Sequence, residues 1–325
     1  MRAAVCPAYG PPEVVRIEDR AEPTVDAGHV LVRVEAAAVN FPDVLLIADE
    51  YQISVPPPFV PGSEFAGVVD EVRGEAHGEA RGFVVGDRVT GTGLFGAFAE
   101  RVAVAPTGLS LIPDGVDART AAAFGVAHRT AYHTLRSMAH VGVGNELVVL
   151  GAGGGVGLAA VQLGVALGAR VTAVASSAEK LHVAAGYGAA NLINHRQGEV
   201  RAALRAALPD GADAVVDPVG GELSEPALRA LRRGGRFVTV GYASGVIPRI
   251  PLNLVLVKGI RIVGFQFQDV PPDEFGRNED ELRELLVSGR VSPHVGAVYP
   301  LDRTVDALRL VADGRAIGKI LIDLS

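Results

Sequence analysis

The chain of 325 residues contains one cysteine, Cys6, no tryptophan and only three lysines. A single thiol excludes an internal disulfide and any zinc site built from several cysteines. No apolar run reaches the ~18–20 residues that span a bilayer, and the first residues do not resemble a signal peptide. A net charge of −7 gives no basic surface for nucleic acid. These absences predict a cytoplasmic globular protein with no membrane insertion and no nucleic-acid partner.

The length and the patterning indicate two kinds of domain. A chain of this size suits about two domains. The first ~120 residues are rich in short alternating runs, such as 29–40, where Val30, Val32 and Val34 share one face. From Asn145 onward, strand-like and helix-like segments alternate, which is typical of a parallel sheet with helices on both faces. The sequence therefore predicts an α/β protein with a doubly wound parallel-sheet domain. One of its helices is expected at 222–233, where Arg232 and Arg233 favour a C-terminal end.

A glycine-rich turn, Gly151 to Gly157, follows the apolar run 147–150 and precedes a helix-like segment. Glycine lets the backbone approach a diphosphate, and the helix N-terminus provides free N–H groups for the anion. The strict G-x-G-x-x-G frame is not met, because Ala152 stands at the first glycine. A tight turn between packed elements would also favour glycines. The surrounding strand and helix pattern instead predicts dinucleotide binding through Gly154, Gly155 and Val156.

The segment after the next strand indicates which dinucleotide is bound. An acidic residue usually lies about 20 residues beyond the glycines and accepts hydrogen bonds from the adenosine ribose. Here Ser176 and Ser177 occupy that place, and Lys180 follows one helical turn later. Small hydroxyls leave room for a 2′-phosphate, and Lys180 can reach it. His195 and Arg196, after the third strand, could complete the cationic site. We therefore predict NADPH over NADH, although Ser177 or Ser176 could serve only as a helix cap.

With these motifs in place, nearly the whole chain resembles the quinone oxidoreductase, or zeta-crystallin-like, branch of the medium-chain dehydrogenase/reductase superfamily. The stretches that carry the resemblance are AAAVNFPDVL (36–45), VPGSEFAGVV (60–69), VGDRV (85–89), GAFAERVAV (96–104), AAAFGVAHRTAYHTL (121–135), 148–180 and GYASG (241–245).

The resemblance implies a domain organisation. Residues 1–122 would form a GroES-like catalytic β-domain, residues 123–265 the dinucleotide-binding domain, and residues 266–325 a segment that returns to the catalytic domain. The active site would lie in the cleft between the domains. A homodimer paired through the edge of the dinucleotide-domain sheet is also expected.

The resemblance also assigns residues. Asn40, Phe41, Tyr51, Thr130 and Tyr132 would line the nicotinamide side, with Asn40 and Tyr51 as the catalytic candidates. Tyr51 would place its hydroxyl at the substrate or only pack its ring there. The residues expected to close over the cofactor are Gly241, Tyr242, Phe265, Phe267 and Lys319.

The chain departs from the zinc-dependent members of this superfamily. Those proteins have a cysteine near positions 39–41 and a histidine in PGHE, whereas here Asn40 and Ser63 stand at these places. Glu64 remains, but a lone carboxylate is not a zinc site. We therefore predict that the protein holds no metal.

The predicted function is an NADPH-dependent, zinc-independent reductase that transfers hydride to a conjugated carbonyl, with a quinone as the preferred acceptor. One alternative is an enoyl-thioester or enone reductase, which must also protonate a carbon atom. A second alternative, from another class, is a non-catalytic NADPH-binding protein.

Overall fold

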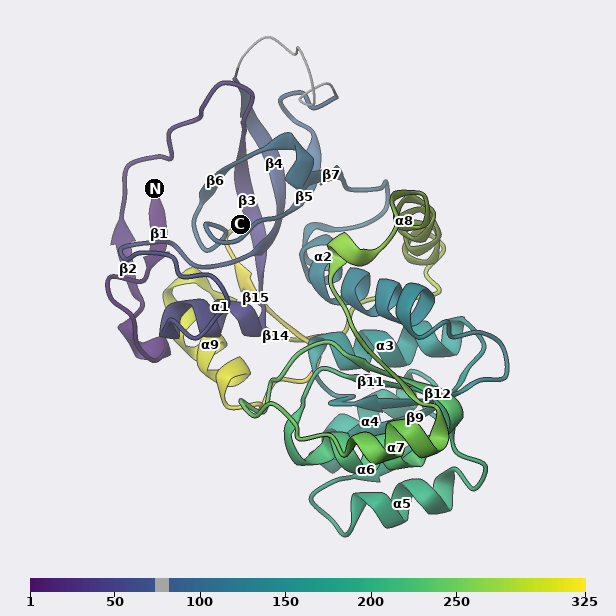
Figure 1. Ribbon diagram of the computed structural model, residues 1–325. Helices are drawn as coiled ribbons and strands as arrows, with labels where there is room; N and C mark the ends of the chain where they lie inside the picture. The colour runs from purple at the N-terminus through teal and green to yellow at the C-terminus, as the bar shows by residue number, and fades with distance from the viewer. Residues whose placement is uncertain (74–81) are drawn as a thin grey trace. The chain divides into compact units, whose positions relative to one another are not determined.

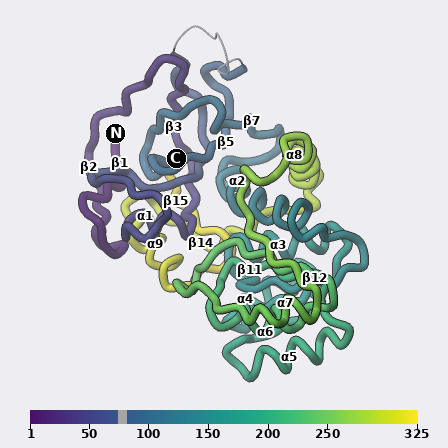
Figure 2. The backbone as a smooth tube through the Cα atoms, in the orientation of Figure 1, coloured from purple at the N-terminus to yellow at the C-terminus, as the bar shows by residue number. Residues whose placement is uncertain are grey.

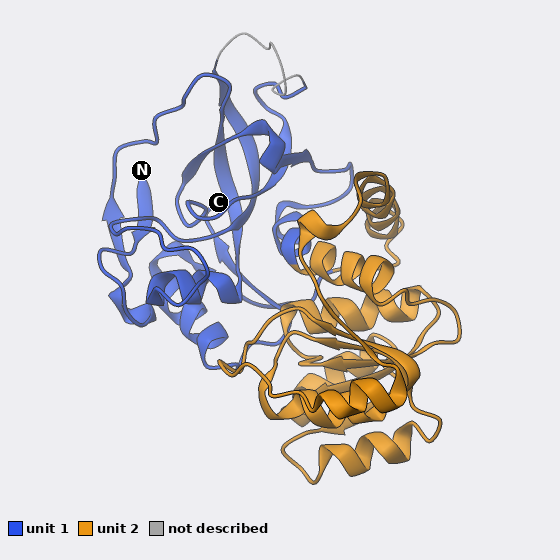
Figure 3. Ribbon diagram, viewed as in Figure 1, with its two compact units in different colours: residues 1–126, 293–325 blue, residues 127–292 orange. Residues whose placement is uncertain are grey.

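The computed structural model describes residues 1–73 and 82–325 (Figure 1). The chain forms two compact units (Figure 3): unit 1 holds residues 1–126 and 293–325, and unit 2 holds residues 127–292. Unit 2 is thus continuous in sequence, whereas unit 1 is completed by the C-terminal segment. The predicted α/β fold, with a parallel-sheet domain and a β-rich domain, is confirmed.

A seven-stranded sheet forms the centre of unit 1, with the strand order β14-β15-β3-β4-β5-β7 and with β6 paired to β3. Its strands are β3 (Val30–Val39), β4 (Glu64–Val72), β5 (Arg88–Thr92), β6 (Arg101–Val104), β7 (Leu109–Leu111), β14 (Val295–Pro300) and β15 (Lys319–Asp323). The smaller elements are the hairpin of β1 (Arg2–Val5) and β2 (Arg16–Asp19), helices α1 (Phe41–Ala48) and α9 (Thr304–Ala312), and 3-10 turns at Pro12–Val14, Pro106–Gly108 and Leu301–Arg303.

The C-terminal strand β15 lies inside the sheet of unit 1, beside β3 from the N-terminal third (Figure 2). It pairs antiparallel with β3, where Ile320 faces Val39, and parallel with β14 on its other side. Val30, Val32 and Val34 of β3 are all buried, as the alternation predicted. This pairing places Lys319, the first residue of β15, near Asn40, which follows β3.

Unit 2 is a six-stranded parallel sheet with the order β10-β9-β8-β11-β12-β13. Its strands are β8 (Glu146–Leu150), β9 (Arg170–Ala175), β10 (Asn191–Asn194), β11 (Ala212–Asp217), β12 (Leu231–Thr239) and β13 (Arg261–Gly264). Numbered along the chain, this order is 3-2-1-4-5-6, that of a doubly wound dinucleotide-binding sheet. In such a sheet all strands end at one edge, where the connecting loops gather.

Helices follow the strands of unit 2. They are α3 (Gly155–Ala166), α4 (Ala178–Gly186), α5 (Val200–Ala207), α6 (Ser224–Ala230), α7 (Leu252–Lys258) and α8 (Pro272–Val287), with 3-10 turns at Gly221–Leu223 and Phe267–Asp269. The last of these helices, α8, comes after the final strand, β13. Helix α2 (Ala118–His133) begins in unit 1, ends in unit 2 and continues into a π-helical turn at Thr134–Met138. In the part of the chain that the structure describes, no helix combines the length and apolar character needed to cross a membrane.

One helix ends earlier than the sequence predicted. Helix α6 stops at Ala230, and Arg232 and Arg233 lie in β12. The Lys258 ammonium, from α7, instead donates to the carbonyl oxygens of Arg229 and Leu231 at 2.6 and 2.7 Å. A cation distant in sequence therefore satisfies the helix end that the local arginines were expected to satisfy.

The returning segment also begins later than the sequence placed it. Residues 266–292, including α8, belong to unit 2, and only residues from Pro293 onward rejoin unit 1. Polar contacts explain the attachment of α8 to α2. Glu279 accepts hydrogen bonds from Arg129 at 2.9 and 3.0 Å and lies 2.7 Å from His133 Nε2.

We predict that Gly157→Ala destabilises the fold by about 1–3 kcal/mol, because a Cβ at this position would lie 2.1 Å from the backbone oxygen of Gly151. The gain of about 1 kcal/mol in helix propensity is too small to offset this overlap. Urea denaturation measures the change. The control is Gly186→Ala, in α4, where a Cβ would meet nothing within 4 Å. It should leave stability unchanged or raise it slightly. Equal stabilities for the two variants would contradict the steric account.

Candidate active site

The glycine-rich turn lies at the carboxyl end of β8 and leads directly into α3. Gly154 is the N-cap, and α3 begins at Gly155. Gly151 has a φ of 63°, which favours glycine, and Gly157 packs so closely on its carbonyl that no side chain fits there. The turn therefore places the N-terminus of α3, with the backbone N–H groups of its first residues, at this edge of the sheet. This is the arrangement that can bind a diphosphate at a helix N-terminus.

Ser176 and Ser177 follow β9, the neighbouring strand. The Ser177 hydroxyl caps α4 by accepting the Lys180 backbone N–H at 3.3 Å, so the capping function expected of a serine here is real. The Lys180 side chain packs across the glycine turn, because a Cβ on Gly153 would lie 2.5 Å from its Cβ and Cγ. The structure thus brings the predicted lysine to the predicted turn.

His195 and Arg196 follow β10, and β10 pairs with β9 so that Asn194 faces Ala175. Burial lowers the pKa of Lys180, and the Arg196 charge lowers it further. Burial also lowers the pKa of His195, with added repulsion from Arg196 and Lys180. These mutual effects show that the three basic groups lie close enough to repel one another. A bound dianionic phosphate would relieve that repulsion.

The remaining strands bring further predicted residues to the same edge. Gly241 and Tyr242 follow β12, and the Gly241 N–H donates to the Asp217 carbonyl at 3.4 Å. Phe265 follows β13 and is buried, whereas Phe267 is partly exposed. The Phe267 ring lies 5.0 Å from that of Phe265, centroid to centroid. All these residues therefore lie at the carboxyl edge of the six-stranded sheet.

Asp217 is a residue at this edge that sequence reasoning missed. Its side chain is fully buried at the end of β11. One carboxylate oxygen accepts the N–H groups of Val219 and Gly220, both at 2.8 Å, and the other accepts the Ser224 hydroxyl at 2.6 Å. Asp217 thereby shapes the loop beside the glycine turn. An acid directly after the apolar run 214–216 was the signal for it.

Two predicted residues on α2 are placed differently from the others. Tyr132 is 2% exposed, and its hydroxyl donates to Glu281 at 2.6 Å. Burial, together with Glu281, raises the pKa of Tyr132. Its hydroxyl is therefore engaged between α2 and α8. Thr130 is buried on the same helix.

Unit 1 holds a compact polar cluster around Asn40. The Lys319 ammonium contacts Asn40 Oδ1 at 2.5 Å and Glu64 Oε2 at 2.9 Å. The Asn40 amide nitrogen donates to Glu64 Oε2 at 3.1 Å and to Ser63 Oγ at 3.4 Å. Lys319 is 3% exposed, so its ammonium is directed into unit 1. The sequence predicted that Lys319 closes over the cofactor, and in the structure its ammonium has these two buried partners.

Asp43 lies beside this cluster, in the first turn of α1. It accepts the Asn40 backbone N–H at 2.7 Å and is completely buried. Burial raises the pKa of Asp43 to about 7, although the hydrogen bond from Asn40 acts in the opposite direction. Near neutral pH this carboxyl group is thus partly protonated, which reduces the negative charge around Glu64.

Phe41 and Tyr51 flank α1. Phe41 is its first residue and is partly exposed, and Tyr51 follows its end. The Tyr51 ring packs against the core of unit 1. Its hydroxyl makes no hydrogen bond to any residue that the structure describes, so it remains free to meet a ligand.

Among residues 1–73 and 82–325, no group of three or more histidine, cysteine, aspartate or glutamate side chains is arranged to hold a metal ion. Cys6 is buried, its thiol lies 3.3 Å from the Ala8 carbonyl oxygen, and burial raises its pKa. A buried thiol of raised pKa is a poor nucleophile.

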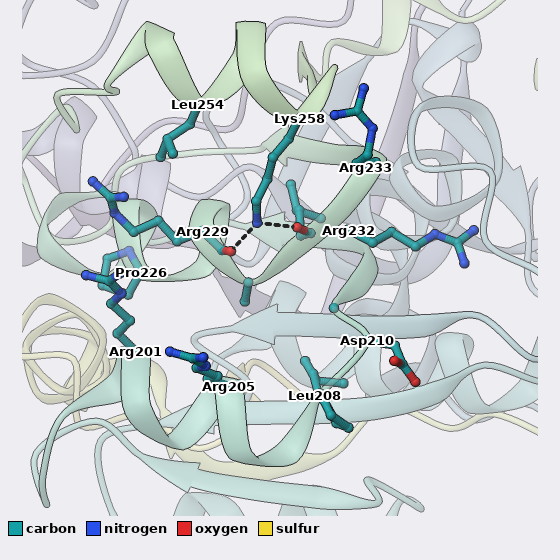
Figure 4. A pocket seen from close by; sticks show the side chains of 14 residues that line it. Arg201, Arg205, Leu208, Asp210, Pro226, Arg229, Arg232, Arg233, Leu254 and Lys258 are labelled. Atoms are coloured by element: carbon teal, nitrogen blue, oxygen red, sulfur yellow. Dashed lines mark hydrogen bonds between the residues drawn. The ribbon is translucent and has the colours of Figure 1, made fainter.

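A cavity of about 390 Å³ lies at the opposite edge of the unit 2 sheet, where β11 and β12 begin (Figure 4). Basic residues line it, but Arg229 pairs with Glu225, Arg232 pairs with Asp213, and Lys258 donates to backbone carbonyls. No predicted cofactor residue lines this cavity. It is separate from the carboxyl edge and does not belong to the candidate site.

Comparison with known proteins gives consistent results. Residues 26–114 match the family model described as "Alcohol dehydrogenase GroES-like domain", and residues 155–284 match that described as "Zinc-binding dehydrogenase". Bovine (Bos taurus) quinone oxidoreductase-like protein 2 is 34% identical over 330 residues, covering 99% of this chain and 92% of the relative. Human (Homo sapiens) quinone oxidoreductase is 30% identical over 326 residues, covering 99% and 97%.

A comparison with solved structures finds the same fold over nearly the whole chain. The quinone oxidoreductase of Thermus thermophilus, whose complex with NADPH has been solved, is 32% identical, with a TM-score of 0.81 over 99% of this chain and 100% of that one. Both domain models and the full-length relatives therefore cover the fold and the site described above. The chain belongs to the quinone oxidoreductase branch of the medium-chain dehydrogenase/reductase superfamily, a superfamily of oxidoreductases.

Proposed function

We propose that this protein is an NADPH-dependent, zinc-independent reductase that transfers hydride to a conjugated carbonyl, with a quinone as its acceptor. The observation that carries the proposal is the group of basic side chains Lys180, His195 and Arg196, with Lys180 beside a glycine turn, in a chain similar over its whole length to quinone oxidoreductases. Bound NADPH supplies the hydride in this reaction.

The residues of unit 2 fit that cofactor. The Gly154 N–H already donates to the Gly151 carbonyl at 2.9 Å. The diphosphate would therefore bind beside Gly154 to the N–H groups of Gly155 and Val156, which begin α3 and have no partner inside the helix. Ser176 and Lys180 would bind the 2′-phosphate, because no carboxylate stands there to repel it. The loop residues Gly241 and Tyr242, together with Phe265 and Phe267, would bound the rest of the cofactor.

In unit 1 we assign Asn40, Phe41 and Tyr51 to the reduction itself. A quinone that accepts hydride carries its new charge on oxygen, which water protonates rapidly. The chain therefore has to orient the acceptor and exclude water more than to supply a strong acid. The free Tyr51 hydroxyl, on a ring held by packing, suits this orienting role.

Zinc independence is supported by the side chains at the positions discussed above. The Asn40 amide nitrogen donates to Ser63 Oγ and to Glu64 Oε2. The Lys319 ammonium already donates to Glu64 Oε2 at 2.9 Å. An amide, a hydroxyl and a lysine-bound carboxylate do not make the nitrogen and sulfur set that zinc prefers.

Two other functions make different predictions. An enoyl-thioester reductase must protonate carbon, and a positioned acid typically contributes ~10²–10⁴-fold to such a step. A non-catalytic NADPH-binding protein would bind the cofactor tightly and turn over no acceptor. Steady-state NADPH oxidation with a panel of acceptors separates these functions.

For the cofactor, we predict that Lys180→Ala weakens NADPH binding about 10- to 150-fold and barely changes NADH binding, because a charge-assisted hydrogen bond contributes about 1.5–3 kcal/mol. Calorimetric titration with each cofactor measures this. Arg205→Ala is the matched control, since Arg205 is an exposed cation of the same unit that lines the separate cavity. Equal losses for NADPH and NADH would contradict the assignment.

The same site predicts a pH dependence. Binding of a phosphate would raise the pKa of His195 from its lowered value in the free protein, so NADPH binding takes up protons. The 2′-phosphate itself takes up a proton at about pH 6, so the contribution of His195 is the NADPH preference of the wild type divided by that of His195→Asn at each pH. This ratio should be greatest at acidic pH and decline as the pH rises through the His195 pKa of the complex, and a ratio that grows with pH would have the wrong sign.

For the acceptor, we predict efficient turnover of a quinone, with less than about a tenfold loss of kcat/KM in Tyr51→Phe, because water protonates the reduced oxygen. Tyr299→Phe, elsewhere in unit 1, controls for the loss of a hydroxyl. Rates should survive prolonged chelator treatment. Strong turnover of an enoyl thioester, lost a hundredfold in Tyr51→Phe while quinone activity stays negligible, would favour the enoyl alternative.

We also infer that the chain forms a homodimer through the edge of the unit 2 sheet. Strand β13 pairs only with β12 among the described strands, and α7 before it buries none of its residues. Exposed apolar side chains gather over this segment, namely Val246, Ile247, Leu252, Leu256, Val257 and Ile262. A second copy related by two-fold symmetry can pair with the edge strand and cover this surface at once.

We predict that Leu256→Glu, at a side chain that is 84% exposed, converts the dimer to a folded monomer. Glutamate retains helix propensity but opposes burial of this face. Light scattering coupled to size exclusion reports the mass. Val143→Glu, an exposed apolar side chain of unit 2 outside the patch, should stay dimeric. A dimer that persists in Leu256→Glu would place the interface elsewhere.

A further inference from the structure

The side chain of Lys319 is an unusual feature of unit 1, because it is 4% exposed and pairs with a Glu64 side chain that is fully buried. Lysine is almost never fully buried unless it is paired, since removal of its charge from water is costly. Replacement of such a pair by apolar residues is often neutral or stabilising. Stability alone therefore gives a weak reason for an ammonium at this place.

The ammonium fixes the orientation of the Asn40 amide. Asn40 Oδ1 accepts from Lys319, and Asn40 Nδ2 donates to Glu64. An amide rotated by half a turn would direct its NH₂ group at the ammonium and its oxygen at the carboxylate, and both contacts would be repulsive. Lys319 and Glu64 together thus permit a single orientation.

Glu64 extends this constraint to another element. Its second oxygen accepts the Val126 backbone N–H of α2 at 2.6 Å. Gly125 provides the necessary space, because a Cβ there would lie 2.8 Å from the same carboxylate oxygen. The cluster therefore joins four segments that are far apart in sequence: the end of β3, the start of β4, helix α2 and strand β15.

We infer that Lys319 is a positioning residue for hydride transfer, which acts by holding Asn40 and Glu64 in place and makes no contact with the cofactor itself. This inference rests on the proposed function. Asn40 is the N-cap of α1 and directly precedes Phe41, so the held amide sets the start of the segment assigned to the reduction. Misplacement of such a segment slows the reaction without weakening the binding of NADPH at unit 2.

The central variant is Lys319→Met/Glu64→Gln, which removes both charges and leaves no unpaired carboxylate in the interior. We expect it to unfold near the wild-type temperature and to bind NADPH within about threefold of wild type. Its kcat should fall about 10- to 100-fold, as expected for misplaced reacting groups. Lys319→Met alone leaves Glu64 unpaired and should unfold at a clearly lower temperature.

Asn40→Ala tests whether Lys319 acts through the amide. Alone it should lower kcat by a similar factor, with little effect on the dissociation constant of NADPH. Added to Lys319→Met/Glu64→Gln, it should cost less than about threefold more, since residues that act as one unit do not contribute additively.

Three results would overturn the inference. Wild-type kcat in the charge-free pair would show that the ion pair is only structural. A tenfold or greater loss of NADPH affinity in that variant would show that Lys319 contacts the cofactor. Additive losses with Asn40→Ala would separate the two residues. Wild-type protein that reduces no acceptor would instead refute the proposed function, and this inference with it.

Discussion

Parallel pairing of six strands in the order β10-β9-β8-β11-β12-β13 is the constraint on which the cofactor site depends. Because the strands are parallel, every loop that follows a strand emerges at the same edge. The glycine turn, the Ser176 segment and His195 come from three successive strands and meet there for this reason alone. The close packing of Gly157 on the Gly151 carbonyl then holds the first turn of α3 next to the end of β8, so that the helix N-terminus faces this edge of the sheet.

The two units arrange their charged side chains in opposite ways. Unit 1 balances Lys319 with Glu64, and burial keeps Asp43 partly protonated. Unit 2 gathers Lys180, His195 and Arg196, whose mutual repulsion and burial lower the pKa values of Lys180 and His195. A balanced cluster is complete without a ligand and serves to hold geometry. A group of neighbouring basic side chains is stabilised by an anion, and such perturbed groups are typical of binding sites.

Local patterns predicted much of this molecule. The apolar alternation of β3, the glycine turn and the replacement of an acid by Ser176 are all properties of adjacent residues. The partners of Lys319, by contrast, lie 255 and 279 residues away in the chain. The engagement of Tyr132 by Glu281 and the capping of α6 by Lys258 are likewise tertiary. Such contacts depend on how elements pack, so no local pattern could show them.

The position of β15 between β14 and β3 affects the order in which the protein is built. Residues 127–292 form unit 2 from continuous sequence, so this unit can fold while the ribosome is still translating the chain. The sheet of unit 1 cannot be completed until residues 319–323 have been synthesised, because they form one of its inner strands. Until then the stretch Ala36–Val39 of β3 lacks its partner on one side, where β6 pairs only with Val30–Arg33. Residues 319–323 thus complete a sheet whose central strands were synthesised some 250 residues earlier.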